Sequence, residues 1–303
     1  MLVFIPFTLL VSGNLVLSSF LLFFSKEKPQ IMADLMGFMH KKNFIAYILS
    51  VLPPFAFLTI FMQLLAETNT KVYPLFLWAS LSFLIGTFLY FWLQKIILSS
   101  KNSKENPMKK LILLFVSALL VNLIGVWLIF SAYEGIISIF SRSETAYQLQ
   151  YLFTIPTFFR VLVFIFLAPA FAASYNIFRM YFTTLLNENT REYAGHLLAQ
   201  AVLALVAVLP LWAIFAFTMI PVNTLSNGIF ALLGITLFLA IALQVIYLQI
   251  ANNSSSRLSV FGFVLFMITL TTVFAADRLI INNSTSIATQ KLIIKAKEME
   301  SGH

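Results

Sequence analysis

Long apolar segments separated by short polar connections dominate the pattern of this chain. A transmembrane helix needs about 20 mainly apolar residues, and eight segments meet that requirement. The pattern predicts spans at about 2–24, 43–66, 73–94, 111–133, 151–178, 197–220, 227–250 and 258–276. We expect the first segment to be a retained helix rather than a signal peptide, because no basic residue precedes it.

Composition agrees with a membrane protein built from helices. Of the 303 residues, 60% are hydrophobic and 10% are charged, and the mean hydropathy is +0.94. A soluble domain is about 25% charged, so this chain cannot cover a core with a hydrophilic surface. The sequence therefore predicts an all-α integral membrane protein in a lipid bilayer. The absence of cysteine excludes disulfides, thiolate metal sites and a covalently attached c-type haem.

The basic residues predict how the helices are oriented. Most Lys and Arg residues lie in the first, third, fifth and seventh connections, whereas the second, fourth and sixth hold only Lys71 and Arg142. Under the positive-inside rule the odd connections are cytoplasmic, so both termini face outward. The net charge of +8 is then explained by topology rather than by binding to nucleic acid.

The two halves of the chain share short motifs in the same order. Ile5-Pro6 recurs as Ile155-Pro156, and His40 before Val51-Leu52-Pro53 recurs as His196 before Val208-Leu209-Pro210. This recurrence predicts two parallel four-helix repeats at 1–133 and 151–276. An outer loop at 134–150 connects them, and an extracytoplasmic tail at 277–303 serves as a docking segment or linker. Chance recurrence in an apolar alphabet is the alternative.

Proline and amide residues inside the spans predict local features of packing. Proline removes a backbone donor and clashes with the preceding turn, so kinks are expected at Pro53, Pro54, Pro169 and Pro210. Amide side chains at membrane depth usually join helices by hydrogen bonds. We expect this role for Asn14, Asn122, Asn176 and Gln244.

Few residues could bind a cofactor, and the candidates are His40, His196 and Arg160. The two histidines precede spans and are expected at the membrane interface rather than as ligands. Arg160 lies inside the fifth span, where it should snorkel outward or pair with Glu134, Glu144 or Asp277. The alternative for Arg160 is an anionic group such as a haem propionate or a lipid headgroup, or a quinone carbonyl. No catalytic residue or metal site is predicted, and no carboxylate lies at mid-span to relay protons.

The first two predicted helices resemble the large subunit of cytochrome bd-type quinol oxidases and their relatives. The similarity lies in Phe4-Ile5-Pro6-Phe7-Thr8 at the start of the first helix, in the run from Leu49 to Gln63 before Tyr73-Pro74, and in the arrangement of eight helices. The family's axial histidines would fall near Met1 and Phe153, so this chain lacks them. The long quinol-binding loop of the oxidases also has no counterpart. The resemblance implies a divergent member in a bacterial inner membrane, with neither haem b nor quinone binding supported by ligands.

Two functions follow from these observations. One is a haem-poor membrane subunit that anchors or connects a respiratory electron-transfer complex and is not catalytic alone. Its outer tail would dock an extracytoplasmic redox partner such as a c-type cytochrome, a partner that the resemblance implies. The alternative is a multi-pass transporter or channel-like protein with a central cavity between the repeats. A purely structural or assembly factor is a third possibility.

Overall fold

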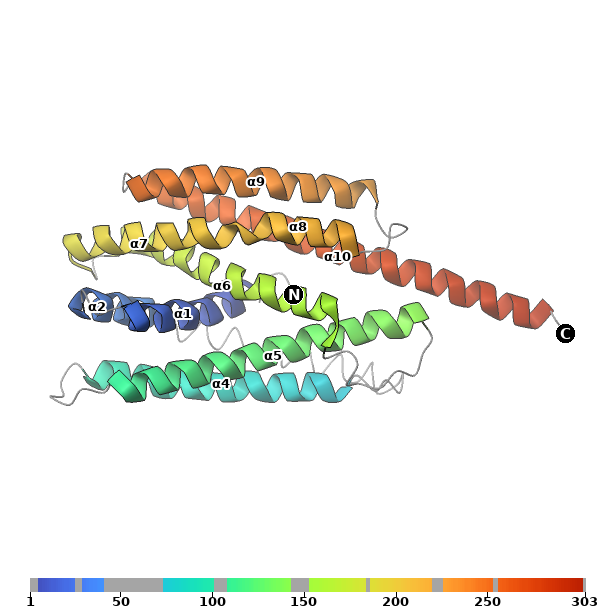
Figure 1. Cartoon of the computed structure of the whole chain (residues 1–303), viewed down its shortest axis with the longest axis horizontal. Helices are drawn as coiled ribbons and strands as arrows, with labels where there is room; N and C mark the ends of the chain where they lie inside the picture. The colour runs from blue at the N-terminus through green and yellow to red at the C-terminus, as the bar shows by residue number, and fades with distance from the viewer. Residues whose placement is uncertain are drawn as a thin grey trace.

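The computed structural model describes residues 5–24, 29–40, 73–100, 108–142, 153–183, 186–219, 226–252 and 256–301, and this part of the chain contains helices and no strands. The helices are α1 (Ile5–Phe24), α2 (Pro29–His40), α4 (Tyr73–Ser100), α5 (Met108–Arg142), α6 (Ile155–Tyr181), α7 (Glu188–Val206), α8 (Val208–Met219), α9 (Asn227–Asn252) and α10 (Ser256–Ser301). They form an elongated bundle from which α10 projects (Figure 1). We call the end with the α6–α7 connection the α7 end, and the opposite end, from which α10 projects, the tail end.

Five helical segments are long and apolar enough to cross a membrane. They are Leu113–Ser131, Ile155–Tyr181, Glu188–Phe215, Asn227–Asn252 and Arg257–Ile280. Two shorter apolar segments, Thr8–Leu21 and Leu77–Tyr90, lie within the predicted first and third spans. The predicted span at 43–66 falls outside the described residues. The protein is therefore a multi-pass helical membrane protein, and the full set of eight spans stays a prediction.

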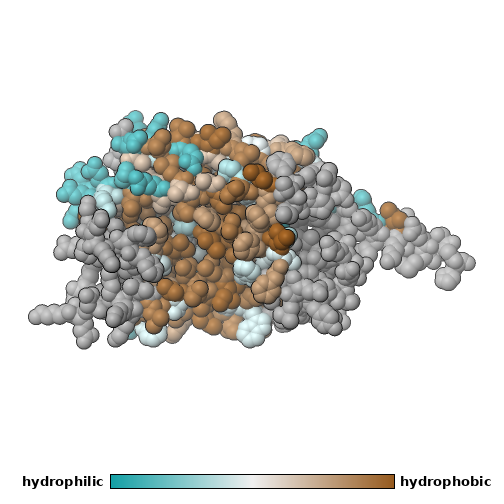
Figure 2. Space-filling model, in the orientation of Figure 1, coloured by the Kyte–Doolittle hydropathy of each residue, from teal (hydrophilic) through white to brown (hydrophobic). Residues whose placement is uncertain are grey.

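The outer surface has the apolar character that a bilayer requires. Large side chains such as Phe88 and Phe238 are 69% and 71% exposed although they lie in the middle of helices. On the face shown in Figure 2, apolar side chains form a broad band across the bundle and hydrophilic ones gather at the α7 end. Such a band would be unstable in water and is explained by contact with lipid.

Three segments are helical beyond the predicted spans. Residues 29–40 form α2, and α5 continues into the predicted outer loop as far as Arg142. Helix α10 continues through the predicted tail to Ser301, whereas the sequence predicted a helix there only from Gln290 to Glu300. The expected boundaries were set by bilayer thickness alone. In α2, apolar residues recur at positions 31, 32, 35, 36, 38 and 39, which is the spacing of a helix with one buried face.

The structure tests two of the predicted proline kinks. Pro210 lies three residues after Ala207, where the helix is interrupted between α7 and α8. Because proline lacks the N–H that would bond the Val206 carbonyl, an interruption there is expected, and the prediction is confirmed. Pro169 instead lies inside the continuous helix α6. Pro53 and Pro54 lie outside the described residues.

The first half of the chain (α1–α5) meets the second half (α6–α10) chiefly where α1 packs along α6. A Cβ atom on Gly13 would overlap the Ala168 carbonyl oxygen and would lie 2.7 Å from the Cβ of Ala172. Only glycine allows the two backbones to approach so closely. Close by, the Asn176 Nδ2 donates to the Asn14 Oδ1 at 2.8 Å, which confirms the predicted link between helices. We call this contact the α1–α6 seam.

Candidate functional site

His40 lies at the centre of a buried polar cluster in the first half of the bundle. Its Nε2 is 2.7 Å from the Ser18 hydroxyl, and its Nδ1 is 2.6 Å from the Tyr90 hydroxyl. The ring of Phe115 lies against the imidazole, with centroids 5.4 Å apart. His40 is 2% exposed, while Ser18 and Tyr90 are fully buried. His40 is therefore enclosed among the helices rather than exposed on the surface of the bundle.

The fold explains how a residue beside Lys41 and Lys42 becomes buried. Helix α2 runs back along α1, so that its last turn lies next to the middle of α1. The Asn14 Nδ2 is 3.5 Å from the Met39 carbonyl oxygen, one residue before His40. Leu35, Phe38 and Met39 are also buried, because they form the apolar face of α2. Burial of this face carries His40 inward with it.

The surroundings of His40 determine its charge. Burial lowers the pKa of His40 to about 3, because the charged form loses its hydration. The imidazole is therefore neutral near pH 7, with one N–H and one lone pair. Both neighbours are hydroxyls, which can donate or accept, so either tautomer makes two hydrogen bonds.

Two further polar groups extend the cluster. Asn14 precedes Ser18 by one helical turn on the same face of α1 and bonds Asn176 across the α1–α6 seam. Arg179, in the last turn of α6, donates from Nη1 to the Phe38 carbonyl at 3.2 Å. Its guanidinium carbon lies 4.6 Å from the centroid of the Phe38 ring. Arg179 thus places a partly exposed cation near the cluster, on the side of the α7 end.

The second half contains a similar set of residues in a different arrangement. The Ser174 hydroxyl on α6 bonds the Tyr247 hydroxyl on α9 directly, at 2.5 Å. His196 on α7 is not part of this pair and is exposed, as the sequence analysis expected. Its Nδ1 donates to the Ala251 carbonyl oxygen at 2.8 Å, so its Nε2 accepts from the Gln200 amide at 2.9 Å. In these two contacts Nδ1 is the donor and Nε2 the acceptor.

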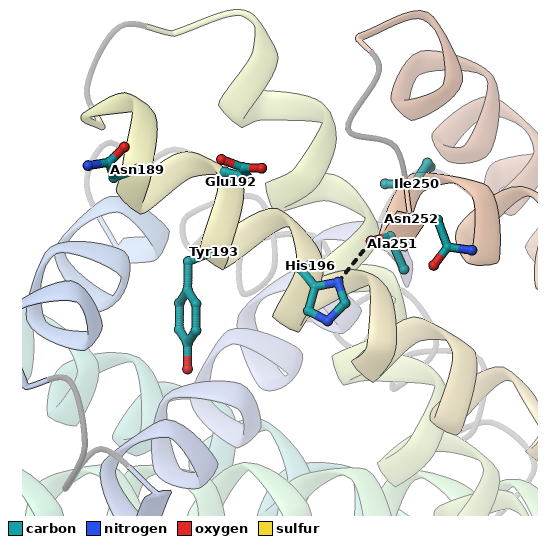
Figure 3. Close-up of a pocket in the computed structure, with 7 residues that line it drawn as sticks. All are labelled: Asn189, Glu192, Tyr193, His196, Ile250, Ala251 and Asn252. Atoms are coloured by element: carbon teal, nitrogen blue, oxygen red, sulfur yellow. Dashed lines mark hydrogen bonds between the residues drawn. The ribbon is translucent and has the colours of Figure 1, made fainter.

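His196 borders a pocket at the α7 end, with a volume of about 680 Å³. Figure 3 shows its lining, in which Asn189, Glu192, Tyr193 and His196 come from α7 and Ile250, Ala251 and Asn252 from the end of α9. The Nδ1 of His196 faces Ala251 across the gap between the two helices (Figure 3).

Arg160 is placed as the sequence predicted. Its Nη2 lies 3.6 Å from the Asp277 Oδ1 on α10, and the two side chains are 14% and 31% exposed. The pairing with Asp277 is confirmed, while the side chains of Glu134 and Glu144 lie outside the described residues. The pair connects α6 to α10 near the tail end, where it offsets the cost of a charge within a span.

The amide predictions divide into links between helices and links within one helix. The Gln244 Nε2 donates to the Leu203 carbonyl at 2.8 Å and so joins α9 to α7. Asn122 instead donates to the Ala118 carbonyl in its own helix, at 2.7 Å, and its amide fills the space that a Cβ on Gly86 would occupy. Three of the four amides therefore join helices as expected.

Sequence reasoning missed Ser18, Tyr90 and Arg179. The spacing of Asn14 and Ser18 was an available signal, since it places two polar groups on one face of a membrane helix. Nothing in the local sequence of Tyr90 indicates a partner 50 residues earlier in the chain.

The resemblance to cytochrome bd-type subunits raises the question of whether either histidine could ligate a haem. An axial histidine needs a ring nitrogen with a free lone pair directed at the iron. In His40 and in His196, protein groups already occupy both ring nitrogens. The described residues also contain no group of three or more His, Cys, Asp or Glu side chains that could hold a metal. The arrangement around these histidines does not fit haem ligation.

No protein-family model, curated protein or solved structure matches this chain.

Proposed function

We propose that this chain is a haem-poor membrane subunit that anchors a respiratory electron-transfer complex and docks a redox partner through its last helix. The observation that supports this proposal best is the length of α10. Its candidate span ends at Ile280, but the helix continues to Ser301 beyond the bundle (Figure 1). At 1.5 Å per residue, this extension reaches about 30 Å past the span. It offers a long helical surface to a partner, and Ile294 on it is 56% exposed.

The base of this extension is attached to the bundle by a charged contact. Asp277 on α10 pairs with Arg160 on α6, three residues before the candidate span ends. A helix fixed at its base can hold a partner in one orientation, which an anchor requires. Under the positive-inside prediction, the extension lies outside a bacterial inner membrane with both termini.

A duplicated architecture is part of the proposal. Ser18 and Ser174 are 156 positions apart, as are His40 and His196, and Tyr90 and Tyr247 are 157 apart. These spacings match the 157 positions between Pro53 and Pro210, while Pro6 and Pro156 are 150 apart. Helix α4 packs along α5 as α9 packs along α10, and α1 runs in the same direction as α6 (Figure 1). Two parallel repeats related to cytochrome bd-type subunits account for these correspondences.

The transporter alternative would need a cavity between the repeats. At the described α1–α6 seam, the backbones of the two helices touch at Gly13 and Ala168. This contact favours a fixed support over a central passage.

Affinity purification from the native membrane tests the anchor. We expect the full chain to co-purify with redox subunits, and a chain truncated after Asn283 to lose them while remaining folded. A matched control replaces residues 284–301 with an unrelated helical sequence of equal length. This control should also lose the partner, since it keeps the length of the helix but not its surface. A full-length protein that purifies alone and transports a small-molecule solute in liposomes would contradict the proposal.

A second variant tests the attachment of α10. Arg160→Leu should reduce the yield of the complex, because Asp277 loses its partner at the base of the extension. Arg191→Leu is the control, since Arg191 forms a weak, exposed pair with Glu188 at the α7 end. Equal yields from the two variants would show that the Arg160 pair does not support docking.

A further inference from the structure

The cluster around His40 has a chemistry that an anchor does not require. Tyr90, His40 and Ser18 form a continuous series of hydrogen bonds across three helices, with distances of 2.6 and 2.7 Å. Imidazole between two hydroxyls is a known arrangement for moving protons, because it can receive a proton on one nitrogen while it releases one from the other. Polar groups buried in a membrane bundle are costly, so a functional role is the first hypothesis for them.

The Tyr90 side of the series lies towards Arg179. Arg179 donates to the Phe38 carbonyl, two residues before His40, and interacts electrostatically with Tyr90. Arg179 belongs to the last turn of α6 and is partly exposed, so this side of the cluster lies towards the α7 end.

The Ser18 side faces an unsatisfied acceptor. Asn176 is fully buried, and its Oδ1 has no hydrogen-bond partner among the described residues. The same amide donates to Asn14, one turn from Ser18 on the same face of α1. Buried polar atoms of this kind are usually satisfied by an ordered water molecule.

We propose that Tyr90, His40 and Ser18 form a proton relay between water at the α7 end and a water molecule held by Asn14 and Asn176 in the α1–α6 seam. A transfer starts from the Nε2–H tautomer of His40. The Tyr90 Oη gives its proton to Nδ1 and takes one from water, while Nε2 gives its proton to Ser18, whose own hydroxyl proton passes to the water in the seam. One proton enters and one leaves, and the imidazole stays neutral but ends as the Nδ1–H tautomer. Before the next transfer the ring turns out of the series and exchanges its Nδ1 proton for one on Nε2. The relay goes beyond anchoring, since it would serve a proton-coupled reaction inside the membrane.

The second half supplies a matched control within the same molecule. There the Ser174 and Tyr247 hydroxyls bond each other and His196 lies apart, so the same three residue types form no relay. Substituting Ser174, Tyr247 or His196 removes the same type of side chain as substituting Ser18, Tyr90 or His40, but leaves the proposed relay intact.

Nitrogen-15 NMR of the histidines in the full-length protein tests the relay. The chain has three histidines, and His196→Gln assigns the signals. The ring N–H of a relay should exchange with D₂O faster than the buried backbone amides of Val11 and Leu15 on α1.

Tyr90→Phe should slow this exchange at least tenfold and shift His40 to the Nε2–H tautomer, since Ser18 is then its remaining partner in the series. Ser18→Ala should shift the ring to the Nδ1–H tautomer but leave exchange fast, because protons still enter through Tyr90.

Several outcomes would overturn the relay. Exchange in the wild type as slow as that of the α1 amides would identify His40 as a sealed structural bridge. Equal slowing in Tyr90→Phe and Tyr247→Phe would mean that the effect is global rather than local. The exchange rate of the His40 ring N–H in the wild type alone decides whether His40 is a sealed bridge. The test therefore holds even where Tyr90→Phe fails to fold. Loss of partner subunits in the purification experiments leaves these rates unaffected, so the two proposals fail independently.

Discussion

His40 and His196 are matched in residue type and in chain spacing, yet one ring is enclosed in the bundle and the other is exposed beside a pocket. Around His40, the serine and the tyrosine each bond the ring. In the second half, the corresponding serine and tyrosine bond each other, and His196 turns to Ala251 and Gln200. The difference therefore lies in the serine and tyrosine hydroxyls. In the first half they bond the histidine and form a continuous series of buried hydrogen bonds, whereas in the second half they bond each other.

The largest effect is expected where the two halves meet. Gly13→Val places a branched side chain against the Ala168 carbonyl, so α1 must move away from α6. We expect a loss of about 3 kcal/mol or more in unfolding free energy, measured by denaturation in detergent. Because α1 carries Ser18, the His40 cluster should be disturbed while the Ser174–Tyr247 pair is kept.

Gly234→Val on α9 is the control for this change. Apart from the adjacent residues and nearby backbone of α9 itself, no described atom lies within 4 Å of a Cβ on Gly234. Both substitutions replace a helical glycine by the same residue, so their difference reports the contact with α6. Similar losses for both variants would mean that the seam is not tightly packed.

A direct comparison of the two histidines comes next. His40→Ala leaves two buried hydroxyls without their partner and creates a cavity, which should cost about 2–3 kcal/mol of unfolding free energy. His196→Ala removes an exposed side chain and should cost less than about 1 kcal/mol. Equal costs in thermal unfolding would contradict the difference in burial.

The pH dependence of stability should also separate the two sites. Because burial lowers the pKa of His40 to about 3, against 6.5 for an ordinary histidine, only the unfolded state takes up a proton on this ring between those values. Its contribution to stability is therefore complete above pH 6.5 and is lost as the pH falls towards 3, by roughly 1.4 kcal/mol per pH unit. Relative to His40→Gln, the wild type should lose about 2 kcal/mol of unfolding free energy between pH 6.5 and 5.

The smallest effect concerns the exposed ring. Gln200→Ala removes the donor to the Nε2 of His196 and should change unfolding free energy by less than about 0.5 kcal/mol. The ¹⁵N signal of the His196 Nε2 should shift, while both ring signals of His40 stay unchanged. A shift at His40 would show that the two sites are coupled.

Features that depend on one segment or one strong physical rule could be predicted from sequence. The apolar spans follow from length and hydropathy, the break before Pro210 follows from its missing N–H, and the Arg160–Asp277 pair follows from the cost of an unpaired charge. The link between Asn14 and Asn176 follows from the same reasoning about polar groups in lipid.

The His40 cluster could not be predicted, because it depends on how distant segments pack. Lys41 and Lys42 indicate an interface, and only the return of α2 along α1 overrides that local signal. The partner Tyr90 comes from another helix, and no periodicity within α2 or α4 indicates the pairing. Bilayer thickness sets the length of the apolar span but not the length of the whole helix. For this reason α5 and α10 continue past their predicted ends.

The close approach of α1 and α6 also bears on how the chain could be divided. Much of what joins the first half to the second is a contact between helix surfaces, reinforced by the amides of Asn14 and Asn176. A polypeptide cut between Arg142 and Phe153 would lose its covalent link but keep that surface. Two co-expressed fragments should therefore find each other in the membrane and reassemble, much as separately made helices associate after insertion.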